Sequence, residues 1–308
     1  MSDTSAEVVM QVSENSDVTV DTGLAADASR RVPAGLARSW LLVPATRTEL
    51  FDEAVRSEAD VVVLDIEDAV DPSRKLAART AVVDRLSRGG RAWVRINDAT
   101  SLFWSDDLAA LRDAPGLLGV MLAKTEAPEH VTATFDRLGG RLPVIALIES
   151  ALGIEEASAI ARAHGSCRLA FGSGDFRRDT GMSADREAMA YPRARLVVAS
   201  KAAKLPGPID GPTVSDSPPI LREQSAVTVQ MGMTGKLCLS TGQAPVVNEV
   251  ISPTPTDVAW AEKFLADFHA HGDIVRDGSD LPRLGRARKI CELAEVFQVL
   301  PTPAIQRH

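Results

Sequence analysis

Short apolar runs and longer amphipathic stretches alternate along the chain from residue 40 onward. The apolar runs are rich in Val, Leu and Ile and are continuous, which is typical of strands buried on both faces of a parallel sheet. Eight such strands are predicted, at residues 40–44, 60–68, 92–97, 117–124, 143–150, 167–175, 207–212 and 235–240. Stretches with helical spacing separate them, among them 47–58, 73–87, 127–139, 153–165 and 191–205.

Repeated strand–helix alternation predicts an α/β protein, either a doubly wound sheet or a (β/α)8 TIM barrel. Eight units within about 200 residues favour the barrel, which we assign to residues 36–250. Two more helices are expected in a C-terminal segment, residues 251–308. Residues 1–35 are acidic and polar, which predicts a disordered leader rather than a signal peptide.

Composition narrows the class of partner. The net charge of −8 and the aromatic content of 4% argue against binding to nucleic acid or to a membrane surface. No apolar run reaches the ~18 residues that a membrane span needs. Three widely spaced cysteines, with no pair at zinc-site spacing, indicate a reducing compartment. We therefore expect a cytoplasmic protein with a small-molecule substrate.

Polar residues stand where the predicted strands end. In a barrel of this kind the carboxyl ends of the strands meet at one face, which carries the site. The residues in question are Asp65, Glu67, Asp68, Arg95, Asn97, Lys124, Glu149 and Asp175. We expect Glu149 and Asp175 to converge at the barrel mouth. The alternative, that such acids only cap loops or pair with arginine, explains one of them more easily than the whole set.

Two carboxylates without a histidine indicate a hard divalent ion such as Mg²⁺. An α-keto acid could displace its waters, and the ion would then act as a Lewis acid. Arg95 would bind the same substrate oxygen or a carboxylate, and its alternative role is a buried structural ion pair. The glycine-rich turn before Asp175 offers backbone N–H groups to a substrate carboxylate.

The segment DIED places three acids within residues 65–68. Strand alternation would send Asp65 and Glu67 to one side and Asp68 to the other. We expect Glu67 or Asp68 to hold waters of the metal ion or to orient Arg95, rather than to ligate the ion directly.

With these residues in place, the chain resembles the citrate lyase β-subunit-like family. That family belongs to the aldolase/citrate lyase superfamily, which includes malyl-CoA and citramalyl-CoA lyases. The resemblance runs from about Arg38 to Phe297. It is carried by RSWLLVPATR, ADVVVLDIEDAV, WVRIN, ALIESALG, GSGDF and GMTGKLCLSTGQ, the last followed by SPTPTDVAWAEKFL.

The resemblance implies a barrel with a C-terminal helical lid, assembled as a homo-oligomer, usually a trimer or hexamer. It implies Mg²⁺ held by Glu149 and Asp175, with Arg95 on the keto-acid or enolate oxygen. A coenzyme A thioester would lie across the mouth, with its phosphates near Arg47 and Lys75.

A lid aspartate acts as acid or base in the related lyases, often from a neighbouring subunit, and Asp280 is the candidate here, with Asp277 as second choice. The implied reaction cleaves or forms a 3-hydroxyacyl-CoA, such as malyl-CoA or citramalyl-CoA, giving an acyl-CoA and a 2-keto acid. Asp68 stands where pyruvate-type class II aldolases carry a histidine, which favours the CoA lyases.

One departure keeps other functions open. Ser240 and Thr241 replace the His-Pro pair that is common at the eighth strand of the family. The alternatives are a class II aldolase acting on a free 2-keto-4-hydroxy acid, a thioesterase variant, and a non-catalytic citrate lyase β-like subunit.

Overall fold

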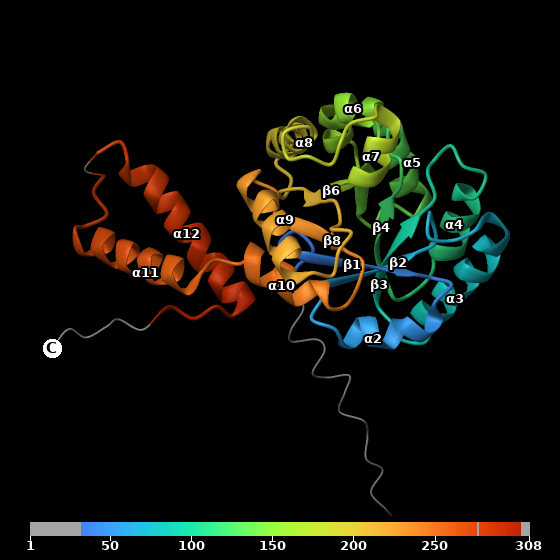
Figure 1. Cartoon of the computed structure of the whole chain (residues 1–308), viewed down its shortest axis with the longest axis horizontal. Helices are drawn as coiled ribbons and strands as arrows, with labels where there is room; N and C mark the ends of the chain where they lie inside the picture. Colours follow the sequence, from blue (N-terminus) through green and yellow to red (C-terminus); the bar gives the residue numbers. More distant parts are fainter. Residues whose placement is uncertain (1–31, 276, 303–308) are drawn as a thin grey trace, which may run out of the picture. The chain divides into compact units, whose positions relative to one another are not determined.

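Eight parallel strands close into a barrel, with each strand hydrogen-bonded to its sequence neighbours and β8 to β1. The computed structural model describes residues 32–275 and 277–302. Figure 1 shows the strands at the centre of the barrel with helices around them. The strands are β1 Ser39–Pro44, β2 Val61–Asp65, β3 Ala92–Ile96, β4 Leu117–Leu122, β5 Val144–Ile148, β6 Ser166–Phe171, β7 Ile209–Asp210 and β8 Gly235–Cys238. This architecture confirms the predicted TIM barrel.

Helices follow nearly every strand and cover the outside of the barrel. They are η1 Thr48–Leu50, α2 Phe51–Arg56, η2 Pro72–Arg74, α3 Lys75–Ser87, α4 Trp104–Leu111, α5 Pro128–Arg137, α6 Ala151–Arg162, α7 Ser173–Thr180, α8 Ala190–Ala202, α9 Pro218–Gln230 and α10 Gln243–Ile251. The sixth strand was predicted to run to Asp175, which is wrong. It ends at Phe171, because the chain turns at Gly172 and the N–H of Phe176 then donates to the Gly172 carbonyl, which starts α7.

The core has two layers because successive strand residues point to opposite sides of the sheet. Inside the barrel, Trp40 and Trp93 meet edge to face with ring centroids 5.5 Å apart. Outside, Leu41 and Val43 of the same first strand pack in the layer between sheet and helices. Both faces are therefore dry, which explains the continuous apolar strands in the sequence.

The C-terminal segment contains α11, Pro255–Ala270, and α12, Asp280–Phe297, which pack against each other. Arg38, at the start of β1, places its guanidinium 4.0 Å from the ring centre of Phe297. The predicted helices are thus present, whereas their role as a lid stays a prediction. The predicted leader lies outside the described residues as far as residue 31. In the described part, no helix is long and apolar enough to cross a membrane.

A buried ionic cluster supports the barrel on its outer side at β7 and β8. Asp210 accepts hydrogen bonds from Arg193 at 2.9 Å and from Thr228 at 2.7 Å. Lys236 lies 3.7 Å from the same carboxylate and donates to the Gly211 carbonyl at 2.7 Å. Burial by itself raises the pKa of Asp210, but Lys236 and Arg193 outweigh it and lower the pKa below its ordinary value.

We predict that Asp210→Asn lowers the free energy of unfolding by about 3–5 kcal/mol, because it leaves the buried Lys236 ammonium without its countercharge. Glu249→Gln is the matched control, since it removes one carboxylate of the exposed Arg222–Glu249 pair and should cost less than about 1 kcal/mol. Urea denaturation followed by circular dichroism measures both. Equal effects of the two substitutions would contradict the assignment.

Candidate functional site

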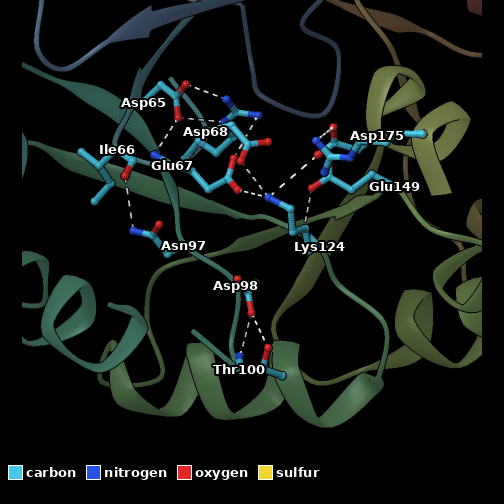
Figure 2. A network of polar contacts seen from close by, with 12 residues as sticks. Asp65, Ile66, Glu67, Asp68, Asn97, Asp98, Thr100, Lys124, Glu149 and Asp175 are labelled. Atoms are coloured by element: carbon cyan, nitrogen blue, oxygen red, sulfur yellow. Dashed lines mark hydrogen bonds and ion pairs between the residues drawn. The ribbon is translucent and has the colours of Figure 1, made fainter. Parts of the chain in front are cut away.

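Acidic and basic side chains from four strand ends meet at the barrel mouth (Figure 2). Glu67 and Asp68 follow β2, Lys124 follows β4, Glu149 follows β5, and Asp175 lies in the first turn of α7. The fold explains the meeting, because the carboxyl ends of all barrel strands lie at the same face. The expected convergence of Glu149 and Asp175 is thus seen, with Lys124 in contact with both.

Arg95 is held by Asp65 through two parallel hydrogen bonds, Nε to Oδ1 at 2.8 Å and Nη2 to Oδ2 at 2.6 Å. Its Nη1 lies 3.5 Å from Glu67 Oε2. Although burial opposes the charge, the Asp65 carboxylate raises the pKa of Arg95 above its ordinary value. Asp65 and Arg95 are register partners on β2 and β3, a pairing that the sequence alone did not single out.

Lys124 lies among the acids at the barrel mouth, and no role was predicted for it from the sequence. Its ammonium contacts Glu67, lies 2.9 Å from Asp68 and lies 3.8 Å from Asp175. Its backbone N–H donates to Glu149 Oε1 at 2.7 Å. Its φ of +46° is in the left-handed region, which is uncommon for a residue other than glycine.

The predicted separation of Glu67 and Asp68 onto opposite sides is wrong. Both carboxylates contact the Lys124 ammonium. The alternation rule holds only within a strand, and β2 ends at Asp65, so the two acids lie in the following loop and turn toward the same cation.

Glu149 is fixed from two sides. The Lys124 N–H holds one carboxylate oxygen, and Gly172 lies against the other. A Cβ at position 172 would lie 2.2 Å from Glu149 Oε2, so any side chain there would push the carboxylate away. Burial and the neighbouring Glu67 carboxylate raise the pKa of Glu149 to about 8.

The mouth carries more negative than positive charge. Once Arg95 has paired with Asp65, the carboxyls of Glu67, Asp68 and Asp175 share the Lys124 ammonium, whereas Glu149 accepts a hydrogen bond from the Lys124 backbone N–H. The exposed Arg178 lies 3.4 Å from Asp175. Burial raises the pKa of Glu67, and burial together with Asp68 raises that of Asp175. The pKa of Asp68 shifts in the other direction. Burial opposes its charge, but the neighbouring Glu67 carboxyl and the Lys124 ammonium, which donates to Asp68 at 2.9 Å, lower its pKa.

Two oxygens of this group, Glu67 Oε2 and Asp175 Oδ2, are buried without a hydrogen-bond partner among the described residues. A hard divalent cation binds carboxylate oxygens, and such an ion would offset the excess negative charge at the mouth. The residues present therefore fit a magnesium ion.

The other residues predicted to take part are Lys75, Arg47 and Asp280. Lys75 is buried, and its ammonium donates to the carbonyls of Ile66 and Glu67 and to Asn97 Oδ1, at 2.7–2.9 Å. Arg47 follows β1 and is 58% exposed, in contact with Glu49. Contact of Lys75 and Arg47 with phosphates stays a prediction, as does the acid–base role of Asp280, which is buried at the start of α12.

Ser240 and Thr241, which follow β8, form hydrogen bonds with neighbouring segments. Ser240 donates to Asp216 at 2.8 Å, and Thr241 donates to Glu53 at 2.8 Å. Asp216 lies in the loop after β7 and Glu53 in α2. The rim beyond β8 is therefore tied to both of its neighbours by hydroxyl groups.

Comparisons with known proteins agree with the fold and with the quoted motifs. A family model described as HpcH/HpaI aldolase/citrate lyase matches residues 38–241, and one described as HpcH/HpaI aldolase C-terminal domain matches residues 256–298. The mitochondrial citramalyl-CoA lyase of Homo sapiens is 31% identical, over 83% of this chain and 85% of that enzyme. The L-malyl-CoA/beta-methylmalyl-CoA lyase of Cereibacter sphaeroides is 28% identical, over 86% of this chain and 96% of that enzyme.

Solved structures give the same result. The protein CitE of Mycobacterium tuberculosis, in complex with magnesium, acetoacetate and coenzyme A, superposes with a TM-score of 0.71. It is 29% identical in sequence, and the match covers 85% of this chain and 99% of that chain. Fold, motifs and relatives therefore point to one family.

We predict that Glu149→Gln stabilises the metal-free protein at pH 8 but not at pH 5. The pKa of Glu149 is raised from 4.5 to about 8 by folding, so the stability present below pH 4.5 is lost as the pH rises toward 8. At 1.36 kcal/mol per pKa unit the gain at pH 8 is at most about 4 kcal/mol. Gln keeps the oxygen that accepts from the Lys124 N–H.

Denaturant unfolding in EDTA at both pH values measures the difference. Glu249→Gln, which changes an exposed carboxylate paired with Arg222, serves as the control. Because Arg222 lowers the pKa of Glu249, this variant should show no pH-dependent gain. A gain of the same size at pH 5 and pH 8 would contradict the buried, uncompensated charge of Glu149.

Proposed function

The chain belongs to the HpcH/HpaI aldolase/citrate lyase family, and from that premise we propose that it is a magnesium-dependent carbon–carbon lyase acting on a 3-hydroxyacyl-CoA. The reaction gives, or in reverse consumes, an acyl-CoA and a 2-keto acid, with malyl-CoA and citramalyl-CoA as the first candidates. The observation that carries the proposal is the excess of carboxylates around Glu149 and Asp175, with Glu67 and Glu149 buried, beside the fixed Arg95 guanidinium.

Glu149 and Asp175 are the proposed ligands of Mg²⁺. The fit rests on their carboxylate oxygens, on the buried Asp175 Oδ2 that has no hydrogen-bond partner among the described residues, and on the closeness of Gly172 to Glu149. When bound, the ion supplies a Lewis acid for the oxygen of the keto acid.

Arg95 is the proposed partner of the keto-acid or enolate oxygen. Asp65 engages its Nε and Nη2, which fixes the plane of the guanidinium. Nη1, which lies 3.5 Å from Glu67 Oε2, is the nitrogen proposed to meet a substrate oxygen. Because the guanidinium is charged at every working pH, it stabilises negative charge that develops on that oxygen without a proton transfer of its own.

Glu67 and Asp68 are proposed to act one step removed from the substrate, by holding waters of the ion and the position of Lys124. Arg47 and Lys75 are proposed to contact the coenzyme A phosphates. The exposure of Arg47 beside β1 supports its part, whereas the ammonium of Lys75 already has three acceptors inside the protein.

Asp280 is the proposed acid–base residue, which moves a proton at the α-carbon of the acyl-CoA. Since the family resemblance implies that this aspartate often comes from a neighbouring subunit, we also propose a homo-oligomer, a trimer or hexamer. The three cysteines are free thiols, which supports a reducing compartment such as the cytoplasm.

We expect the purified protein to release a 2-keto acid from malyl-CoA, citramalyl-CoA or β-methylmalyl-CoA only when Mg²⁺ is present. Glu149→Gln and Asp175→Asn should each lower this turnover at least about 100-fold, because each removes a ligand charge. Keto acid and free thiol are assayed separately, with Glu249→Gln as the control for an unrelated carboxylate.

Thiol without keto acid would replace the lyase by a thioesterase. Turnover of a free 2-keto-4-hydroxy acid alone would replace it by an aldolase. Undiminished magnesium-dependent turnover in both ligand variants would overturn the metal assignment.

Asp280→Ala should slow proton exchange at the methyl group of acetyl-CoA by about 10²–10⁴-fold if Asp280 is the general base. Asp277→Ala is the matched comparison, because Asp277 is an exposed aspartate three residues earlier that accepts from the Ser279 N–H. Exchange in deuterated buffer is followed by mass spectrometry. A loss confined to Asp277→Ala would transfer the role to that residue.

A further inference from the structure

We propose that Lys124 is the positioning residue of the mouth: its ammonium is a built-in cation that gathers the carboxyls in the ion-free protein and competes with the divalent ion for them. The proposal rests on the proposed function for the identity of that ion. Its first half, the gathering of the carboxyls, is carried by contacts within the chain alone.

Lys124 reaches the proposed ligands by two separate routes. The side-chain ammonium lies 3.8 Å from Asp175 Oδ2, and the backbone N–H donates to Glu149 Oε1 at 2.7 Å. A left-handed backbone at a lysine costs on the order of 1 kcal/mol and persists only where the surroundings determine it. Here the contacts of the Lys124 ammonium and of its backbone N–H hold the residue in this conformation.

The contacts of the ammonium are unequal. It contacts Glu67 and lies 2.9 Å from Asp68, but it is 3.8 Å from Asp175. The ammonium can therefore keep Glu67 and Asp68 when a cation takes Asp175. This division leaves Asp175 as an ion ligand and keeps the other two acids in place beside it.

The charges determine whether Lys124 strengthens or weakens the binding of the ion. A divalent ion on Asp175 and Glu149 lies close to an ammonium of the same sign, so the two cations repel in a partly buried site where screening is weak. Without the ion, the same ammonium offsets part of the repulsion among the mouth acids. Lys124 therefore stabilises the ion-free protein and weakens the binding of the ion.

The test compares the wild-type chain with Lys124→Met, Lys124→Arg and the control Lys289→Met, which removes an exposed lysine paired with Glu292. Thermal unfolding in EDTA reports on the ion-free protein, and calorimetric titration with Mg²⁺ reports on the ion. Lys124→Met should unfold at a lower temperature in EDTA and bind Mg²⁺ at least about fivefold more tightly. Lys124→Arg, which keeps the charge, and Lys289→Met should stay near the wild type in both.

A double variant separates charge from packing. Glu67→Gln added to Lys124→Met removes a carboxylate that the ammonium balanced, so it should recover part of the lost stability in EDTA. This comparison also applies if Lys124→Met alone fails to fold, because recovery of a folded protein by Glu67→Gln supports the countercharge role. No recovery would overturn it.

The outcomes distinguish this proposal from the proposed function. Weaker Mg²⁺ binding by Lys124→Met would overturn the competition, because the removal of a competing cation must tighten the binding of the ion. If the wild-type chain binds no Mg²⁺, the proposed metal site fails, while unfolding in EDTA still decides whether Lys124 gathers the acids. Unchanged stability in EDTA would overturn that part.

Discussion

Excess negative charge at the barrel mouth is the constraint on which the rest of the site depends. Closing eight parallel strands brings Glu67, Asp68, Glu149 and Asp175 to one face, and the protein supplies the Lys124 ammonium beside the Arg95–Asp65 pair. Burial makes this imbalance costly and raises the pKa of Glu149 to about 8. A site that holds uncompensated carboxylates in this way is poised for a cation, and the proposed lyase chemistry uses that cation at the substrate oxygen.

The scaffold beneath the mouth resists the repulsion by fixing the backbone. Lys75 ties the carbonyls of Ile66 and Glu67 to the side chain of Asn97, and Asn97 donates to Asp107. These groups are buried, so their hydrogen bonds are shielded from water, and they hold the loop after β2 to the end of β3. The acids are therefore presented from a rigid base, which catalytic positioning requires.

The rim above this base, beyond β8, is a second part of the mouth. Ser240 and Thr241 form hydrogen bonds to Asp216 and Glu53, so they link three neighbouring segments around β8. The charged centre and the rim are thus separate parts. In the proposed function the centre carries the reaction, and the rim would influence the choice among acyl groups, where small changes in shape are worth ~1–3 kcal/mol.

The sequence by itself predicted the eight strands, the barrel and the meeting of Glu149 and Asp175 at its mouth, because strand length, apolar continuity and the placement of polar residues shortly after the strands are local properties. Only the tertiary structure decided how these residues pair. Asp65 holds Arg95 because the register of β2 on β3 sets them side by side. Lys124 reaches Glu67, 57 residues away, because barrel closure and a left-handed backbone aim it there, and neither is written in any local pattern.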